Sequence, residues 1–182
     1  TGELAHGYME IRYLLQEDLR GALTVAQETE DSFKEVFGRG GDALLEPYRC
    51  DDADHIVVGL GSITYQLHDV VDALREEGHA VGVLGLRLYR PFPDEALAQV
   101  LGGARGVVVI EKAVSYGYEG PLCSDVKAAL YQAGDAGSRP FVKGMTAGIG
   151  GRDIRTADLI ADLRAVVTGT MQEGPGWIGM KL

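Results

Sequence analysis

The strongest constraint on the fold is an alternation of short apolar runs with helical segments that begins at His55. Three near-continuous apolar runs, at 55–60, 80–89 and 106–111, are each followed by a segment in which apolar residues recur every three or four positions. Strands buried on both faces of a parallel sheet have this continuous apolar character. Because the helices would form the crossovers between strands, we predict a three-layer α/β fold, with a mostly parallel sheet of about five strands and helices on both faces.

The same reasoning places the other elements and divides the chain into three parts. Helices are predicted over residues 65–77, 94–101, 121–132 and 156–167, and a further short strand over 141–142. An N-terminal helical segment is predicted over 10–37, either as one long helix or as two abutting helices with Gly21 as the weak point, and an irregular connector over 42–54. We expect a helical extension over 1–52, an α/β domain over 53–170 and a tail over 171–182. The only tryptophan, Trp177, is expected to dock either on this domain or on a neighbour.

Charge and composition argue against several classes of function. The 182 residues include 17 Lys and Arg against 27 Asp and Glu, and this net charge of −10 disfavours binding to nucleic acid or to an anionic membrane surface. No apolar stretch approaches the roughly 20 residues of a membrane span, and the N-terminal sequence lacks the features of a signal peptide. Cys50 and Cys123 lie far apart and are expected to be free thiols of a cytoplasmic protein.

A glycine-containing turn follows the first apolar run. Gly61, Ser62 and Ile63 open the next helix, and such a loop can present backbone N–H groups to a phosphate. Thr64 stands where a dinucleotide-binding fingerprint would have its third glycine. The turn is therefore either a tight strand-to-helix connection or a candidate anion loop.

Two further features lie where the later strands end. Glu111 ends the third apolar run. We expect it to pair with a nearby cation (Lys112, Arg87 or Arg90), and the alternative is a functional carboxylate. The glycine-rich segment 144–153 is either a turn packed on a neighbouring domain or a ligand loop. No catalytic residue and no metal site is predicted, because the histidines, serines and cysteines lack the spacing that such sites need.

A rigid corner joins the second apolar run to the helix after it. The run Arg87-Leu-Tyr-Arg-Pro-Phe-Pro93 contains two prolines, which fix backbone angles, and Asp94 is expected to cap the helix that follows. No catalytic set accompanies the two arginines. Arg87 and Arg90 are therefore predicted to contact carboxylates at an interface, where the forked guanidinium group binds well.

Six runs, taken in order, carry a resemblance to a known family: Tyr8–Tyr13, Phe37–Arg39, Gly61–Ser62, Arg87–Pro93, Ser115–Pro121 and Gly148–Asp153. Together they resemble the α subunits of 2-oxoacid:ferredoxin oxidoreductases, and pyruvate:ferredoxin oxidoreductases in particular. The resemblance covers nearly the whole chain and is to the transketolase C-terminal-like domain, domain II, with the helical link that precedes it. The pyrimidine-binding domain of that family is missing here, which indicates an excised domain, a proteolytic remnant or a split subunit.

The resemblance implies a complex that decarboxylates a 2-oxoacid on thiamine diphosphate, reduces ferredoxin through iron–sulfur clusters and makes an acyl-CoA. In that family thiamine diphosphate, Mg and the iron–sulfur clusters are held by other domains or subunits, so no cofactor is assigned to this chain alone. Its expected role is structural, with other domains and subunits of the oxidoreductase as partners, and with ferredoxin and CoA as partners of the whole complex. The candidate interface residues are Arg87, Arg90, Tyr116, Arg152 and Asp153.

Two alternatives stay open. The chain could be a free-standing regulatory module or one that binds an anion or CoA. Its ligand would then lie at the turn of Gly61 and Ser62 or near Arg90. It could also be the equivalent domain of another thiamine enzyme, although the run Gly148–Asp153 favours the ferredoxin-linked family.

Overall fold

The computed structural model describes residues 2–134, 139–170, 174 and 176–180, with side chains from residue 7 onward. The chain divides into two compact units, which we describe separately. The smaller unit comprises Thr1–Leu45 and Arg87–Pro93, and the larger comprises Glu46–Leu86 and Asp94–Leu182.

The sheet has six strands among the described residues. Their spatial order is β1 (Leu45–Tyr48), β3 (Val81–Leu86), β2 (His55–Leu60), β4 (Gly106–Glu111), β5 (Phe141–Thr146) and β6 (Gly176–Trp177). The pairings of β2 with β3 and β4, of β4 with β5, and of β5 with β6 are all parallel. The predicted α/β fold with a mostly parallel sheet is therefore confirmed.

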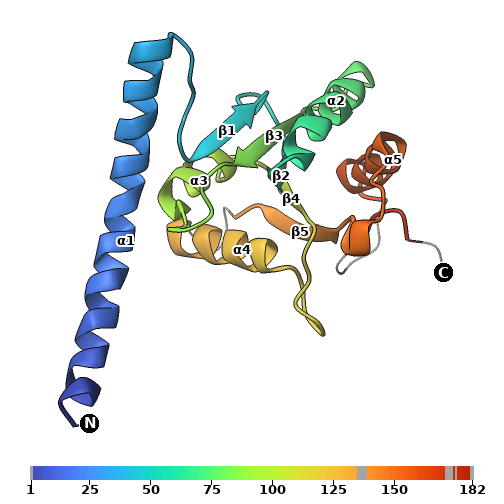
Figure 1. Ribbon diagram of the computed structural model, residues 1–182. Coiled ribbons are helices and arrows are strands. Elements are labelled where there is room, and N and C mark those ends of the chain that lie inside the picture. Colours follow the sequence, from blue (N-terminus) through green and yellow to red (C-terminus); the bar gives the residue numbers. More distant parts are fainter. Residues whose placement is uncertain (1, 135–138, 171–173, 175, 181–182) are drawn as a thin grey trace. The chain divides into compact units, whose positions relative to one another are not determined.

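Helices cover both faces of this sheet (Figure 1). On one face α2 (Ile63–Glu76) contacts α5 (Thr156–Val167), and on the other α3 (Asp94–Leu101) contacts α4 (Pro121–Ala133). Val57 packs into the core cluster with α2 and α5, whereas its neighbours Ile56 and Val58 are equally buried but point to the opposite face. Burial on both faces explains why the strands read as continuous apolar runs, and each such side chain contributes about 1.5–3 kcal/mol to stability.

The smaller unit is built on one long helix, α1 (Gly2–Phe37). It confirms the predicted N-terminal helix, begins earlier than expected and runs through Gly21 without a break. Gly38, at a φ of 64°, ends it, and its N–H group donates to Lys34 O at 2.9 Å. Within this unit Arg87 Nη1 donates to Asp42 O at 2.6 Å and lies 3.3 Å from Glu30 Oε1.

One detail of the prediction was wrong. The connector expected over 42–54 contains the strand β1. β1 lies at the edge of the sheet and has only one neighbouring strand, so Pro47, which has no N–H group to donate, is tolerated there. Six strands among the described residues agree with the predicted sheet of about five. The sixth, β6, comes from the tail, where Ile178 N donates to Thr146 O at 2.9 Å.

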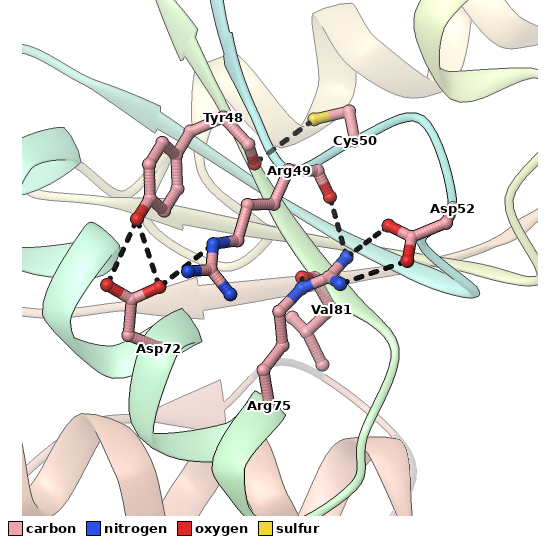
Figure 2. Close-up of polar contacts among 7 residues, drawn as sticks. All are labelled: Tyr48, Arg49, Cys50, Asp52, Asp72, Arg75 and Val81. Carbon is pink, nitrogen blue, oxygen red and sulfur yellow. Dashed lines mark hydrogen bonds and ion pairs between the residues drawn. The ribbon is translucent and has the colours of Figure 1, made fainter.

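A polar network fastens the segment after β1 to β3 and α2 (Figure 2). Arg75 of α2 donates from Nε to Val81 O at 2.6 Å and from Nη2 to Arg49 O at 2.9 Å. The same guanidinium group holds both carboxylate oxygens of Asp52, at 2.6 and 3.1 Å. The segment lies so close to β3 that a Cβ atom at Gly82 would stand 2.5 Å from Arg49 O, which explains the glycine in this buried strand.

Candidate functional site

The order of the strands creates a crevice at the carboxyl end of the sheet. From β2 the chain passes to β3 on one side, and it then crosses to β4 on the other side of β2. The loops that follow β2 and β4 therefore leave the sheet in opposite directions. Ligands of open α/β sheets bind at such a switch point.

A cleft of about 290 Å³ lies at this position, and we call it the switch-point cleft. Three segments line it: the start of α2, the residue after β4, and the glycine-rich loop after β5. Its lining residues are Ser62, Ile63, Gln66, Lys112, Gly148, Gly151, Arg152, Asp153 and Ile154.

The turn before α2 forms the first wall. Gly61 has a φ of +76°, which favours glycine, and its carbonyl accepts a hydrogen bond from Thr64 N at 3.1 Å. Ser62 occupies the N-cap position, but its hydroxyl group makes no capping bond to the helix. The Ser62 hydroxyl group therefore stays available as a hydrogen-bond donor on this wall of the cleft.

The glycine-rich loop forms the second wall. Gly148 has a φ of +67°, and a Cβ atom there would lie 2.9 Å from Ile154 Cδ1 and 3.4 Å from Lys112 Cε. Only glycine satisfies both the backbone angle and this close approach. Gln66 joins the two walls, because its Nε2 donates to Ile154 O at 2.7 Å. Arg152 Nη1 donates to Gly179 O at 2.7 Å and so ties the loop to the tail.

The structure brings together four of the residues singled out in the sequence. Ser62 and Ile63 of the candidate anion loop line the same cleft as Arg152 and Asp153, which were predicted as interface residues. Lys112 also lines the cleft, and the sequence reasoning missed it as a site residue. Ligands of open α/β sheets bind beyond the carboxyl ends of the strands. Lys112 directly follows a predicted strand, so its position in the sequence could have identified it.

The other candidate residues lie elsewhere. Arg87 and Arg90 belong to the smaller unit, where the Arg90 guanidinium group lies 4.1 Å from the centre of the Tyr89 ring. Tyr116 lies in the loop between β4 and α4 and is 93% exposed. Their predicted role at an interface stays a prediction.

Glu111 has a different partner from the one expected. Its carboxylate accepts hydrogen bonds from Leu122 N at 3.0 Å and Cys123 N at 2.9 Å, at the start of α4. Burial raises the pKa of Glu111, and these two bonds act in the opposite direction. The prediction of a salt bridge with a nearby cation was therefore wrong. The partner of Glu111 is instead the N-terminus of α4, because the N–H groups and the dipole at the start of a helix favour a carboxylate.

A second buried carboxylate secures the same helix. Burial opposes the ionisation of Glu119, but hydrogen bonds from Lys127, Cys123 and Ser124 outweigh it and lower the pKa of this carboxyl group. Burial raises the pKa of Cys123 to about 12, so its thiol is not a nucleophile at neutral pH. Both Cys50 and Cys123 are free, as predicted.

Comparison with known proteins gives a consistent result. Residues 53–159 match the family described as pyruvate:ferredoxin oxidoreductase core domain II. The chain is 39% identical over 164 residues to the pyruvate synthase subunit PorA of Thermotoga maritima, a match that covers 90% of this chain and 41% of that protein. It is 34% identical over 178 residues to the ketoisovalerate oxidoreductase subunit VorA of Pyrococcus abyssi, a match that covers 96% of this chain and 44% of that protein.

A solved structure shares the fold. The 2-oxoglutarate:ferredoxin oxidoreductase from Magnetococcus marinus superimposes with a TM-score of 0.52 at 16% identity, over 74% of this chain and 21% of that chain. The present chain thus spans less than half the length of the curated relatives that it matches.

Proposed function

The chain belongs to the pyruvate:ferredoxin oxidoreductase core domain II family, and we propose that it acts as a structural and interface domain of a 2-oxoacid:ferredoxin oxidoreductase. The complete complex oxidatively decarboxylates the 2-oxoacid, with pyruvate as the first acid to test, to an acyl-CoA and reduces ferredoxin in the cytoplasm. Other domains and subunits of that complex are the direct partners of this chain. Arg87, Arg90 and Tyr116 are proposed contacts with them.

An exposed apolar stripe on α1 carries this proposal. Ile11, Leu14 and Leu19 are 59%, 60% and 47% exposed, and Leu15 lies between them on the same side of the helix. Burying such a side chain contributes about 1.5–3 kcal/mol, and monomeric proteins rarely expose contiguous apolar patches of this kind. The remainder of the oxidoreductase is the occupant that we propose, because the relatives are more than twice as long as the matched region.

The residues described do not fit the cofactors of the complete enzyme. In the described ranges, no group of three His, Cys, Asp or Glu side chains could hold a metal ion such as the Mg²⁺ that accompanies thiamine diphosphate. Two separate thiols, Cys50 and Cys123, do not form an iron–sulfur site. We therefore assign thiamine diphosphate, Mg²⁺ and the clusters to other parts of the complex and derive no chemical step in this chain.

No described helix is long and apolar enough to cross a membrane.

Co-purification with the other domains and subunits of the oxidoreductase tests the proposal. Leu15→Glu places a charge in the apolar stripe and should abolish co-purification, whereas Thr24→Glu adds the same charge on the opposite, exposed side of α1 and should leave it intact. Helical content, measured by circular dichroism, should be equal in the two variants. Loss of co-purification in both variants, or in neither, would contradict a role for the stripe.

A further inference from the structure

We propose that the switch-point cleft binds a small phosphate ester of a polyhydroxy compound, such as a sugar phosphate. This goes beyond the proposed role of the domain in packing and does not depend on it. Three charged residues line the cleft: Lys112, Arg152 and Asp153. The lining therefore carries one more positive than negative charge, in a chain whose net charge is −10.

The two cations converge from separate segments. Lys112 follows β4 directly, and Arg152 belongs to the glycine-rich loop after β5. Within the described part of the chain, no hydrogen bond or ion pair engages the ammonium group of Lys112. Its stem packs against Gly148, whose missing side chain leaves room for it. An anion in the cleft would thus meet an available ammonium group, and charge-assisted hydrogen bonds of this kind are the strong ones.

The wall formed by α2 supplies a donor to the same space. The Ser62 hydroxyl group lines the cleft and is not used to cap α2. The N–H group of Thr64 in the same turn is already bonded to Gly61 O. A phosphate group accepts several hydrogen bonds at once, so it matches donors of three kinds in the lining: the ammonium group of Lys112, the guanidinium group of Arg152 and the hydroxyl group of Ser62. A helix start alone would not specify a ligand; here it faces a cleft that two cations also line.

Asp153 restricts the ligand further. A carboxylate accepts hydrogen bonds and repels a free phosphate ion. A ligand that carries hydroxyl groups next to its phosphate can donate to Asp153 while the phosphate contacts Lys112 and Arg152. The volume of about 290 Å³ suits a sugar phosphate and is at the small end of ligand pockets.

The cleft is held in shape before any ligand arrives. Gln66 bonds to Ile154 O and Thr156 Oγ1, so α2 and the glycine-rich loop form one piece. Arg152 Nη1 donates to Gly179 O, which ties the glycine-rich loop to the tail. A site that is already ordered loses less entropy when it binds a ligand.

Isothermal titration calorimetry on the 182-residue chain, with ribose 5-phosphate and inorganic phosphate as probes, tests the proposal. We expect saturable binding of ribose 5-phosphate at one site, with inorganic phosphate about tenfold weaker. Lys112→Gln should weaken binding of the ester about tenfold or more, and Ser62→Ala should weaken it less. Asp153→Asn should strengthen the binding of inorganic phosphate and reduce the preference for the ester over inorganic phosphate.

Arg105→Gln is the matched control. Arg105 is exposed at the amino end of the sheet, just before β4, so its loss changes the net charge of the same unit away from the cleft. Binding should stay within about twofold of the unaltered chain. Absence of saturable binding, or equal weakening by the Lys112 and Arg105 variants, would overturn the proposal. Neither result would affect co-purification through α1, so the two proposals fail separately.

Discussion

Gln66 and Ile154 are 88 positions apart in the sequence and are joined by one hydrogen bond, in which Gln66 Nε2 donates to Ile154 O at 2.7 Å. The same amide group lies 3.2 Å from Thr156 Oγ1, at the first residue of α5. Gln66 and Ile154 both line the switch-point cleft, so this bond ties two of its walls together. The bond to Thr156 also connects α2 to the start of α5 on the same face of the sheet.

Gln66→Ala should destabilise the larger unit by about 1–2 kcal/mol, because the substitution leaves the Ile154 carbonyl without its partner. Gln132→Ala is the control, since Gln132 is an exposed glutamine of α4 and the change in helix propensity is the same. Urea unfolding followed by fluorescence gives both free energies of unfolding. Equal values for the two variants would show that the bond does not stabilise the fold.

Gly120→Ala should be severely destabilising, by about 3 kcal/mol or more, because the added Cβ atom would overlap the Glu111 carboxylate. The backbone of Gly120 has an ordinary extended conformation, with φ −70° and ψ 149°, so the penalty is steric rather than conformational. Gly103→Ala is the matched control, since nothing lies within 4 Å of its Cβ position. In a Glu111→Ala background the penalty of the Gly120 substitution should shrink. A double-mutant cycle with no coupling would contradict this.

Arg75→Met should cost more stability than Asp52→Ala. The side chain of Asp52 is 72% exposed, so the ion pair itself contributes little. Arg75 also donates to two backbone carbonyls, Val81 O and Arg49 O, and these lose their partner in the methionine variant. We expect a loss of about 2 kcal/mol for Arg75→Met and less than half of that for Asp52→Ala. Urea denaturation measures both, and the reverse order would contradict the assignment.

The ion pair of Glu119 and Lys127 should make stability depend on pH. The folded-state pKa of Glu119 lies below its ordinary value of 4.5, so its ionisation stabilises the fold above that value, and the contribution is lost as the pH falls through the folded-state pKa. Lys127→Gln removes a main cause of the lowered pKa. The difference in unfolding free energy between the unaltered chain and the Lys127→Gln variant should be largest near neutrality and shrink as the pH falls below 4.5.

Arg105→Gln, which removes a charge far from Glu119, serves as the control for this experiment. The difference in unfolding free energy between the Arg105→Gln variant and the unaltered chain should be small at every pH. If the effect of Lys127→Gln were the same at all pH values, the pKa of Glu119 would not depend on this pair.

The sheet and its helices could be predicted because their signal is local. The runs at 55–60 and 106–111 are apolar without interruption, and both coincide with the observed strands β2 and β4. The strands that were missed lie at the edges of the sheet. β1 contains Pro47 and buries only part of its surface, and β6 has only two residues, so neither has a periodic pattern to recognise.

The candidate site was predicted only in part, for a related reason. Ser62 and Arg152 stood out within their own loops, but their proximity comes from the order of the strands, which no local pattern reveals. Glu111 was assigned the wrong partner because ion pairs are the default expectation for a carboxylate beside cations. Its actual partners are backbone N–H groups, which the identity of neighbouring residues does not indicate.

Calorimetric titration of the isolated chain with thiamine diphosphate and Mg²⁺ tests the central claim most directly, since an interface domain should hold no cofactor of the oxidoreductase by itself. We predict no saturable binding to the chain alone and saturable binding to the complete complex that contains it. Saturable binding of thiamine diphosphate to the isolated chain would contradict the account.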